Sequence, residues 1–129
     1  MEILRQKVKA DKKLVISVNL SLTDAEAKAF WPVYDAYQND LKPINERLAK
    51  MVLDYADAWN KGPISDATAK KLLDEALAID AAEAKLKSSS MPKILAALPA
   101  AKAARYYQIE SKIRAAIHYE LAAGIPLIE

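Results

Sequence analysis

The 129-residue chain contains no cysteine and only two glycines, Gly62 and Gly124. Without cysteine it forms no disulfide, no thiolate metal site and no cysteine nucleophile. Two isolated glycines exclude a glycine-rich phosphate loop, and they are too few for the tight turns of a β-rich protein of this length. These absences favour an all-α fold.

Histidine is almost as scarce, because His118 is the only one. A carboxylate-bridged di-metal site in a helical bundle needs Glu-x-x-His pairs, but Ala115 stands three residues before His118. The few serines form no Gly-x-Ser-x-Gly elbow. We therefore expect no metal, no cofactor and no enzymatic activity, and we interpret His118 as a surface or boundary residue.

The chain also lacks a strong excess of either charge, since its formal net charge is +2. Nucleic-acid-binding domains usually carry a pronounced basic patch, so no nucleic-acid partner is expected. We interpret the locally basic segment 5–13 as a solvated helix face, with a phosphate or anionic-membrane contact as the alternative. No apolar run approaches the roughly 20 residues that span a bilayer. No signal peptide is visible, so the chain is either cytoplasmic or a mature exported protein whose leader has been removed.

Hydrophobic residues make up 53% of the chain, and many of them are alanine, the best intrinsic helix former. A chain of this length corresponds to one domain, which we assign to residues 1–129. Capping signals and apolar periodicity divide it into four helical segments. Because their connections are short, we predict a four-segment antiparallel helical bundle, or long bent hairpins.

The second segment carries the clearest helical signals. Thr23 and Glu26 form a capping box, which predicts that the helix starts there. The apolar positions that follow alternate in steps of four and three residues, as in a helix packed against near-parallel partners. These positions are Phe30, Tyr34, Tyr37, Leu41, Ile44, Leu48, Met51 and Tyr55. Because the pattern passes through Pro32 and Pro43 unbroken, we predict a long helix that is kinked there but does not end.

The first and last segments each show an apolar stripe. The first is expected from residue 2 to about residue 18, with a stripe consisting of Leu4, Val8, Val15 and Val18. The last begins at Pro99, which suits a first helical turn, and ends with Gly124 in the C′ position. Its stripe consists of Tyr106, Ile109, Ile113, Ile117 and Leu121.

The third segment is predicted to start after an N-cap at Ser65. Its apolar face consists of Leu72, Leu73, Ala76, Leu77, Ile79 and Leu86. We expect a kinked continuation to Leu98, with a break near Ser90 as the alternative. Beyond the last helix, Ile125–Ile128 is a short apolar tail, which we expect to fold back onto the bundle. The alternative is a surface that binds a partner.

Candidate binding residues come from the aromatic group of the second helix, from a polar and aromatic group of the fourth, and from the tail. They are Phe30, Trp31, Tyr34, Tyr37, Arg105, Tyr106, Gln108, Glu110, Ile125 and Leu127. In one interpretation Arg105 and Glu110 reach polar groups on the aromatic helix, including the hydroxyl of Tyr34 or Tyr37, and stabilise the core. In the other, the aromatic side chains leave a small-ligand pocket at the proline bends.

Three stretches also carry a resemblance: Leu22–Glu26, Phe30–Tyr34 and Arg105–Glu110. Together they resemble a group of small exported helical proteins of proteobacteria. The Leu-Thr-x-x-Glu start is similar to the Leu-Thr-x-x-Gln motif of the Spy/CpxP family of periplasmic stress proteins, with Glu26 in place of the glutamine. That resemblance implies dimers of long bent helical hairpins, a periplasmic location and a role as an ATP-independent chaperone or envelope-stress protein.

The leading functional hypothesis is thus a non-enzymatic, chaperone-like binding protein that captures unfolded or apolar protein segments. It predicts that removing Ile125 to Ile128 weakens this capture. One alternative is a module that binds a small apolar ligand in an aromatic pocket. Another is a structural or assembly subunit, including a homodimer, whose heptad face packs against another helix.

Overall fold

The computed structural model describes the backbone of residues 2–129 and the side chains of residues 11–129. It contains four helices: α1 (Glu2–Leu20), α2 (Asp24–Asn60), α3 (Asp66–Ala97) and α4 (Ala100–Gly124). Residues 2–129 contain no strand, which confirms the predicted all-α class. None of these helices is long and apolar enough to cross a membrane.

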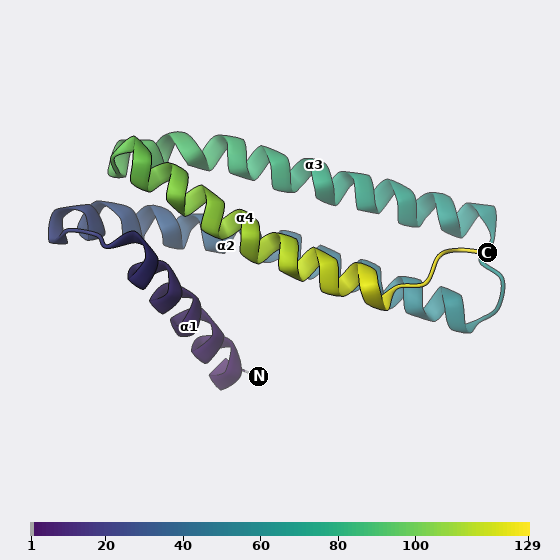
Figure 1. The fold of residues 1–129 in the computed structure, drawn as a ribbon. Helices are drawn as coiled ribbons and strands as arrows, with labels where there is room; N and C mark the ends of the chain where they lie inside the picture. The colour runs from purple at the N-terminus through teal and green to yellow at the C-terminus, as the bar shows by residue number, and fades with distance from the viewer. Residues whose placement is uncertain (1) are drawn as a thin grey trace.

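The long helices α2 and α3 form an antiparallel hairpin and the most extensive helix pair of the fold (Figure 1). Helix α4 returns along this hairpin and brings the chain end close to the turn between α2 and α3. Helix α1 contacts α4 over a shorter stretch, and its N-terminal part diverges from the other helices. The arrangement is therefore a long hairpin with two further helices packed on it.

Helix α2 starts where the capping box predicts. The Thr23 hydroxyl accepts the Glu26 amide at 3.2 Å, and the Glu26 carboxylate accepts the Thr23 amide at 2.9 Å. At its other end Gly62 adopts a φ of 115°, a left-handed conformation that side chains disfavour, so glycine is well suited to the turn into α3. Ser65 then caps α3 by accepting the Thr68 amide at 3.2 Å.

Three of the six prolines lie inside helices, Pro32 and Pro43 in α2 and Pro92 in α3. All three are exposed. On the solvent side, water can hydrogen-bond the carbonyl that each proline leaves without an amide partner. The prediction that α2 continues through its prolines is confirmed. The alternative of a break near Ser90 is wrong, because Ser90 is buried within an uninterrupted α3.

The core consists of two clusters of buried residues. The first joins all four helices and contains Ile16, Leu20, Phe30, Tyr34, Ile94, Leu98, Ala103 and Tyr106. The second lies along the α2–α3 hairpin and contains Tyr37, Leu41, Ile44, Leu48 and Ile79. Every buried residue of α2 belongs to the predicted seam, which confirms that pattern up to Leu48; Met51 and Tyr55 beyond it are half-buried.

The predicted inner face of α1 is wrong. Val15 and Val18 are 48% and 70% exposed, whereas Ile16 and Leu20 are buried. The predicted stripe residues Leu4 and Val8 lie outside the described side chains, as do the first residues of the basic segment 5–13. The buried positions of α1 are thus rotated by about one residue from the apolar stripe in the sequence.

Three predictions for α3 and α4 also need correction. Leu73 and Leu77 belong to the predicted apolar face of α3, but each is 58% exposed. Ile117 belongs to the predicted stripe of α4 and lies on the same helix face as the buried Tyr106 and Glu110, but it is 41% exposed. Gly124 is the last helical residue and not the C′ residue, since the cap is Ile125 in an extended conformation.

Candidate functional site

The aromatic candidates of α2 pack closely against α4. Phe30 lies edge-on to Tyr106 with ring centroids 5.0 Å apart, and Tyr34 lies 6.1 Å from the same ring. Trp31 contacts Tyr34 edge-on at 5.2 Å and is half-buried. Edge-to-face contacts at these distances are favourable between aromatic rings. Tyr37 is separate from this group and belongs to the core of the α2–α3 hairpin.

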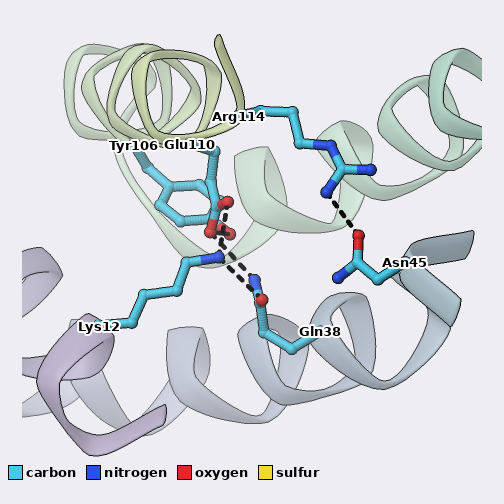
Figure 2. Close-up of polar contacts among 6 residues, drawn as sticks. All are labelled: Lys12, Gln38, Asn45, Tyr106, Glu110 and Arg114. Carbon is cyan, nitrogen blue, oxygen red and sulfur yellow. Dashed lines mark hydrogen bonds and ion pairs between the residues drawn. The ribbon is translucent and has the colours of Figure 1, made fainter. Parts of the chain in front are cut away.

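Beside these rings lies a buried polar network that joins three helices (Figure 2). The carboxylate of Glu110, a residue only 6% exposed, accepts hydrogen bonds from the Tyr106 hydroxyl at 2.8 Å and from Gln38 Nε2 at 3.0 Å. Lys12 Nζ of α1 forms an ion pair with the same carboxylate at 3.1 Å and donates to Gln38 Oε1 at 2.9 Å. A buried carboxylate is stable only when it is paired in this way.

The network corrects the predicted partners of Glu110. Its contact on α2 is Gln38 and not a tyrosine hydroxyl. Gln38 and Lys12 are not among the predicted site residues, because a polar residue beside an apolar seam and a lysine in a basic segment are both typical of a solvated face. The spacing did contain a signal for Lys12, since Lys12, Ile16 and Leu20 follow one another at steps of four residues on one helix face.

Burial in this region changes the titration of the tyrosines. Loss of hydration raises the pKa of Tyr106 far above its ordinary value of 10.0, and the Glu110 charge raises it further. The same two causes raise the pKa of Tyr37 to about 12. The pKa of Tyr34 is also raised, first by burial and then by Glu110. All three phenols should therefore stay neutral at pH values above 10.0.

The remaining polar candidates of α4 lie at the surface. Arg105 is exposed and donates through Nε to the Asn19 carbonyl at 2.5 Å, so it contacts the end of α1 and not the aromatic helix. Nearby, Lys102 bridges the same turn by donating to the Ser21 carbonyl at 2.9 Å and to Glu26 at 2.6 Å. Gln108 is exposed. Thus Arg105 and Lys102 fix the α1–α2 turn against α4.

A second polar cluster joins α2, α3 and α4 further along α4. The Arg114 guanidinium donates to Glu83 and to Asn45. His118 Nε2 lies 3.2 Å from the other Glu83 oxygen and is partly exposed, which fits the boundary position predicted for it. Burial alone would raise the pKa of Glu83, but the Arg114 hydrogen bond and charge, together with His118, outweigh it and hold that pKa below its ordinary value.

The tail forms a third candidate site. Residues 125–129 leave α4 without helical structure, and they lie against α2 and α3 near the hairpin turn. The Tyr55 hydroxyl of α2 donates to the Pro126 carbonyl. Ile125 is half-buried and Ile128 is 45% exposed, whereas Leu127 is 89% exposed. The predicted fold-back of the tail is thus observed, and of the two tail candidates Ile125 lies against the helices and Leu127 does not.

An apolar groove of about 250 Å³ remains between this tail and the hairpin. We call it the tail groove. It is lined by Met51, Val52, Tyr55, Ala69, Leu72, Leu73, Ala76, Ile125 and Ile128. No charged residue is among these lining side chains, so the groove is apolar. The two helices that line it carry ion pairs beside it that are locally neutral, including Lys50 with Asp54 at 2.6 Å and Lys70 with Asp74 at 2.7 Å.

A larger cavity of about 440 Å³ opens between α3 and α4. Its lining is mixed and consists of Asp80, Glu83, Ala84, Lys87, Ser88, Met91 and Tyr107. Lys87 lies over the Tyr107 ring, 5.5 Å from the centroid. None of the predicted aromatic candidates lines this cavity or the tail groove.

Comparison with protein-family models, with curated proteins and with solved structures finds no match for this chain. Within the part of the chain that the structure describes, no group of three or more histidine, aspartate or glutamate residues is clustered so that it could hold a metal ion. Its function must therefore be inferred from its own surfaces and side chains.

Proposed function

We propose that this protein is a non-enzymatic, chaperone-like binding protein that captures extended apolar polypeptide segments, and that the tail groove is its binding site. The observation that carries the proposal is the seating of the chain's own tail. The apolar tail Ile125–Ile128 covers apolar side chains of α2 and α3 and forms one side of the tail groove, and Tyr55 holds its Pro126 carbonyl. An unfolded client offers the same two features, which are apolar side chains and unpaired carbonyls.

The shape and charge of the tail groove support an apolar peptide over other ligands. Its free volume of about 250 Å³ is below the roughly 300–1,000 Å³ of small-molecule pockets. Leu77, which is 58% exposed like the groove-lining Leu73, extends the apolar surface of α3 beyond the groove. Because the ion pairs beside the groove are locally neutral, binding should depend weakly on salt concentration.

The direct test is suppression of aggregation of a heat-unfolded client at near-stoichiometric ratio without nucleotide. α3 offers a matched pair of variants, because Leu73 in the groove is 58% exposed and Leu95, outside the groove lining, is 54% exposed. Both changes to glutamate place a charge on an exposed site, so neither should unfold the helix. We expect Leu73→Glu to abolish suppression and Leu95→Glu to retain it.

Two results would contradict the proposal. If the parent protein does not suppress aggregation, it is not a chaperone-like protein for such clients. If Leu73→Glu and Leu95→Glu weaken suppression equally, clients bind general apolar surface and not the tail groove. The periplasmic location and the dimeric state implied by the resemblance stay predictions, and protease protection in intact cells and sedimentation at several concentrations would check them.

A small-molecule function has one specific observation in its favour, which is the cavity between α3 and α4. Its volume of about 440 Å³ falls in the range of ligand pockets, and Tyr107 offers an aromatic wall between charged residues. This observation supports Tyr107, and not the predicted aromatic group of α2, as the site of such a ligand. A ligand that raises the melting temperature of the parent but not of a Tyr107→Ala variant would favour it.

A further inference from the structure

We infer that the Ile125–Ile128 tail is a built-in competitor that closes the tail groove and must leave it before a client binds. This inference rests on the proposed function and adds regulation to the same site. The tail covers the apolar side chains of the hairpin and the Tyr55 hydroxyl that a client would contact, so the tail must move away before a client binds there.

The tail is held by few contacts. Ile128 is 45% exposed and Leu127 is 89% exposed, so much of the tail's apolar surface stays in water. About 250 Å³ of apolar space remains unfilled beside it. Side chains that line such a gap lose part of the dispersion energy of a close-packed contact. The bound tail is therefore stable enough to cover the groove but is not packed like the core.

A weakly held competitor reduces the apparent affinity of the groove in a defined way. The apparent dissociation constant equals the intrinsic one divided by the fraction of molecules whose groove is open. Two partly buried isoleucines and one hydrogen bond favour the closed groove by roughly tenfold. A client that binds only weakly is then excluded, whereas a strongly apolar segment displaces the tail.

A competing tail predicts the opposite effect of tail removal on client capture from the one that the sequence suggested. If the tail were part of the client surface, its loss would weaken capture. If it is a competitor, its release strengthens capture, and the hairpin should stay folded because the buried cores of the two clusters lie elsewhere. The sign of one measurement thus separates the two roles.

The probe is a fluorescein-labelled synthetic peptide with the sequence of residues 122–129, and its binding to the full chain is followed by anisotropy. The release variant is Ile125→Ser combined with Ile128→Ser. Leu127→Ser is its matched control, since it makes the same kind of change in the same tail at an exposed side chain. We expect the release variant to bind the peptide about tenfold more tightly than the parent, and the control to bind like the parent.

Trp59 reports tail release without any peptide. Its ring stacks on Tyr55 with centroids 6.3 Å apart, and Tyr55 holds the tail. In a Trp31→Phe background Trp59 is the single tryptophan, and its emission should change in the release variant but not in the Leu127→Ser control. Equal emission from both would mean that the tail is not seated on Tyr55, which overturns the inference.

The binding results separate failure of this inference from failure of the proposed function. If the parent and the release variant bind the peptide with equal affinity and Leu73→Glu abolishes binding, the groove binds peptide but the tail does not compete for it. That result would overturn the inference and leave the proposed function intact. Weaker binding by the release variant would make the tail part of the client surface and also overturn the inference. No binding by any variant, together with no suppression of aggregation, would contradict the groove as a peptide site altogether.

Discussion

Replacing Glu110 with alanine tests whether the buried network stabilises the fold. Glu110 accepts the Tyr106 hydroxyl at 2.8 Å, and Tyr106 is 0% exposed, so the substitution leaves that hydroxyl buried without an acceptor. An unsatisfied buried group costs about 1–3 kcal/mol. Lys12 retains Gln38 Oε1 at 2.9 Å and has a side chain 22% exposed, so its lost ion pair adds only about 1 kcal/mol. We expect a total loss of about 3 kcal/mol.

For a domain of this size a loss of about 3 kcal/mol lowers the melting temperature by roughly 10 °C. Thermal and urea unfolding followed by circular dichroism would measure it. Glu120→Ala is the control, because Glu120 lies exposed on the same helix and its loss should change stability by less than about 0.5 kcal/mol. Hydrogen exchange should also accelerate in α1, since Lys12 is the α1 residue that contacts Glu110.

A double-mutant cycle with Tyr106→Phe identifies the cause. Removing the hydroxyl together with its acceptor leaves no orphaned phenol at position 106, so the double variant should be more stable than the sum of the single effects by about 1–2 kcal/mol. Additivity within about 0.5 kcal/mol would refute the reasoning, because the Tyr106–Glu110 bond would then carry no coupling energy. A Glu110→Ala loss below about 1 kcal/mol would refute it as well.

Three other predictions concern capping and titration. Thr23→Ala removes the capping box of α2 and should cost about 1 kcal/mol in urea unfolding, whereas no change would mean that the helix start is fixed by packing alone. The folded pKa of Glu83 lies below its ordinary value of 4.5, so ionised Glu83 stabilises the fold fully above pH 4.5, and this stabilisation is lost as pH falls through the folded pKa. Glu83→Gln should therefore reduce the dependence of the unfolding free energy on acidic pH in urea titrations. An unchanged pH dependence would contradict this prediction. The buried tyrosines have raised pKa values, so they should stay protonated above the ordinary value of 10.0, and stability should fall as pH rises beyond it. These residues are Tyr34, Tyr37 and Tyr106. Tyrosinate absorbance that develops fully without unfolding would show that these rings are accessible.

The sequence was sufficient for the helices because their signals are local. The capping box at Thr23 and the four-and-three spacing of apolar residues depend only on neighbours along one helix. That spacing also correctly indicated that α2 passes through Pro32 and Pro43, since a helix that ended there would have lost the phase of its seam. The fold class and the second helix were therefore predictable without tertiary information.

The faces of α1 and α4 were not predictable in the same way, because charged residues face inward on both. Apolar letters alone led to Val15 and Ile117, which are 48% and 41% exposed. The same face of α4 also buries Glu110, whose burial depends on Lys12 and Gln38 from two other helices. Such pairing depends on how the helices are placed relative to one another. The spacing of residues along one helix does not contain that information.

The polar network also explains why α1 has one rotational setting. Apolar burial alone distinguishes poorly between rotational settings of α1. A rotation of about 100°, which corresponds to one residue of an α-helix, would bury Val15 in place of Ile16. That rotation would move Lys12 away from Glu110 and leave a carboxylate that is 6% exposed without its cation. An uncompensated buried charge is far more costly than the difference between two aliphatic side chains. The charge pair therefore selects the setting of α1 even where it adds little net stability, and this is why loss of Glu110 should loosen α1 first.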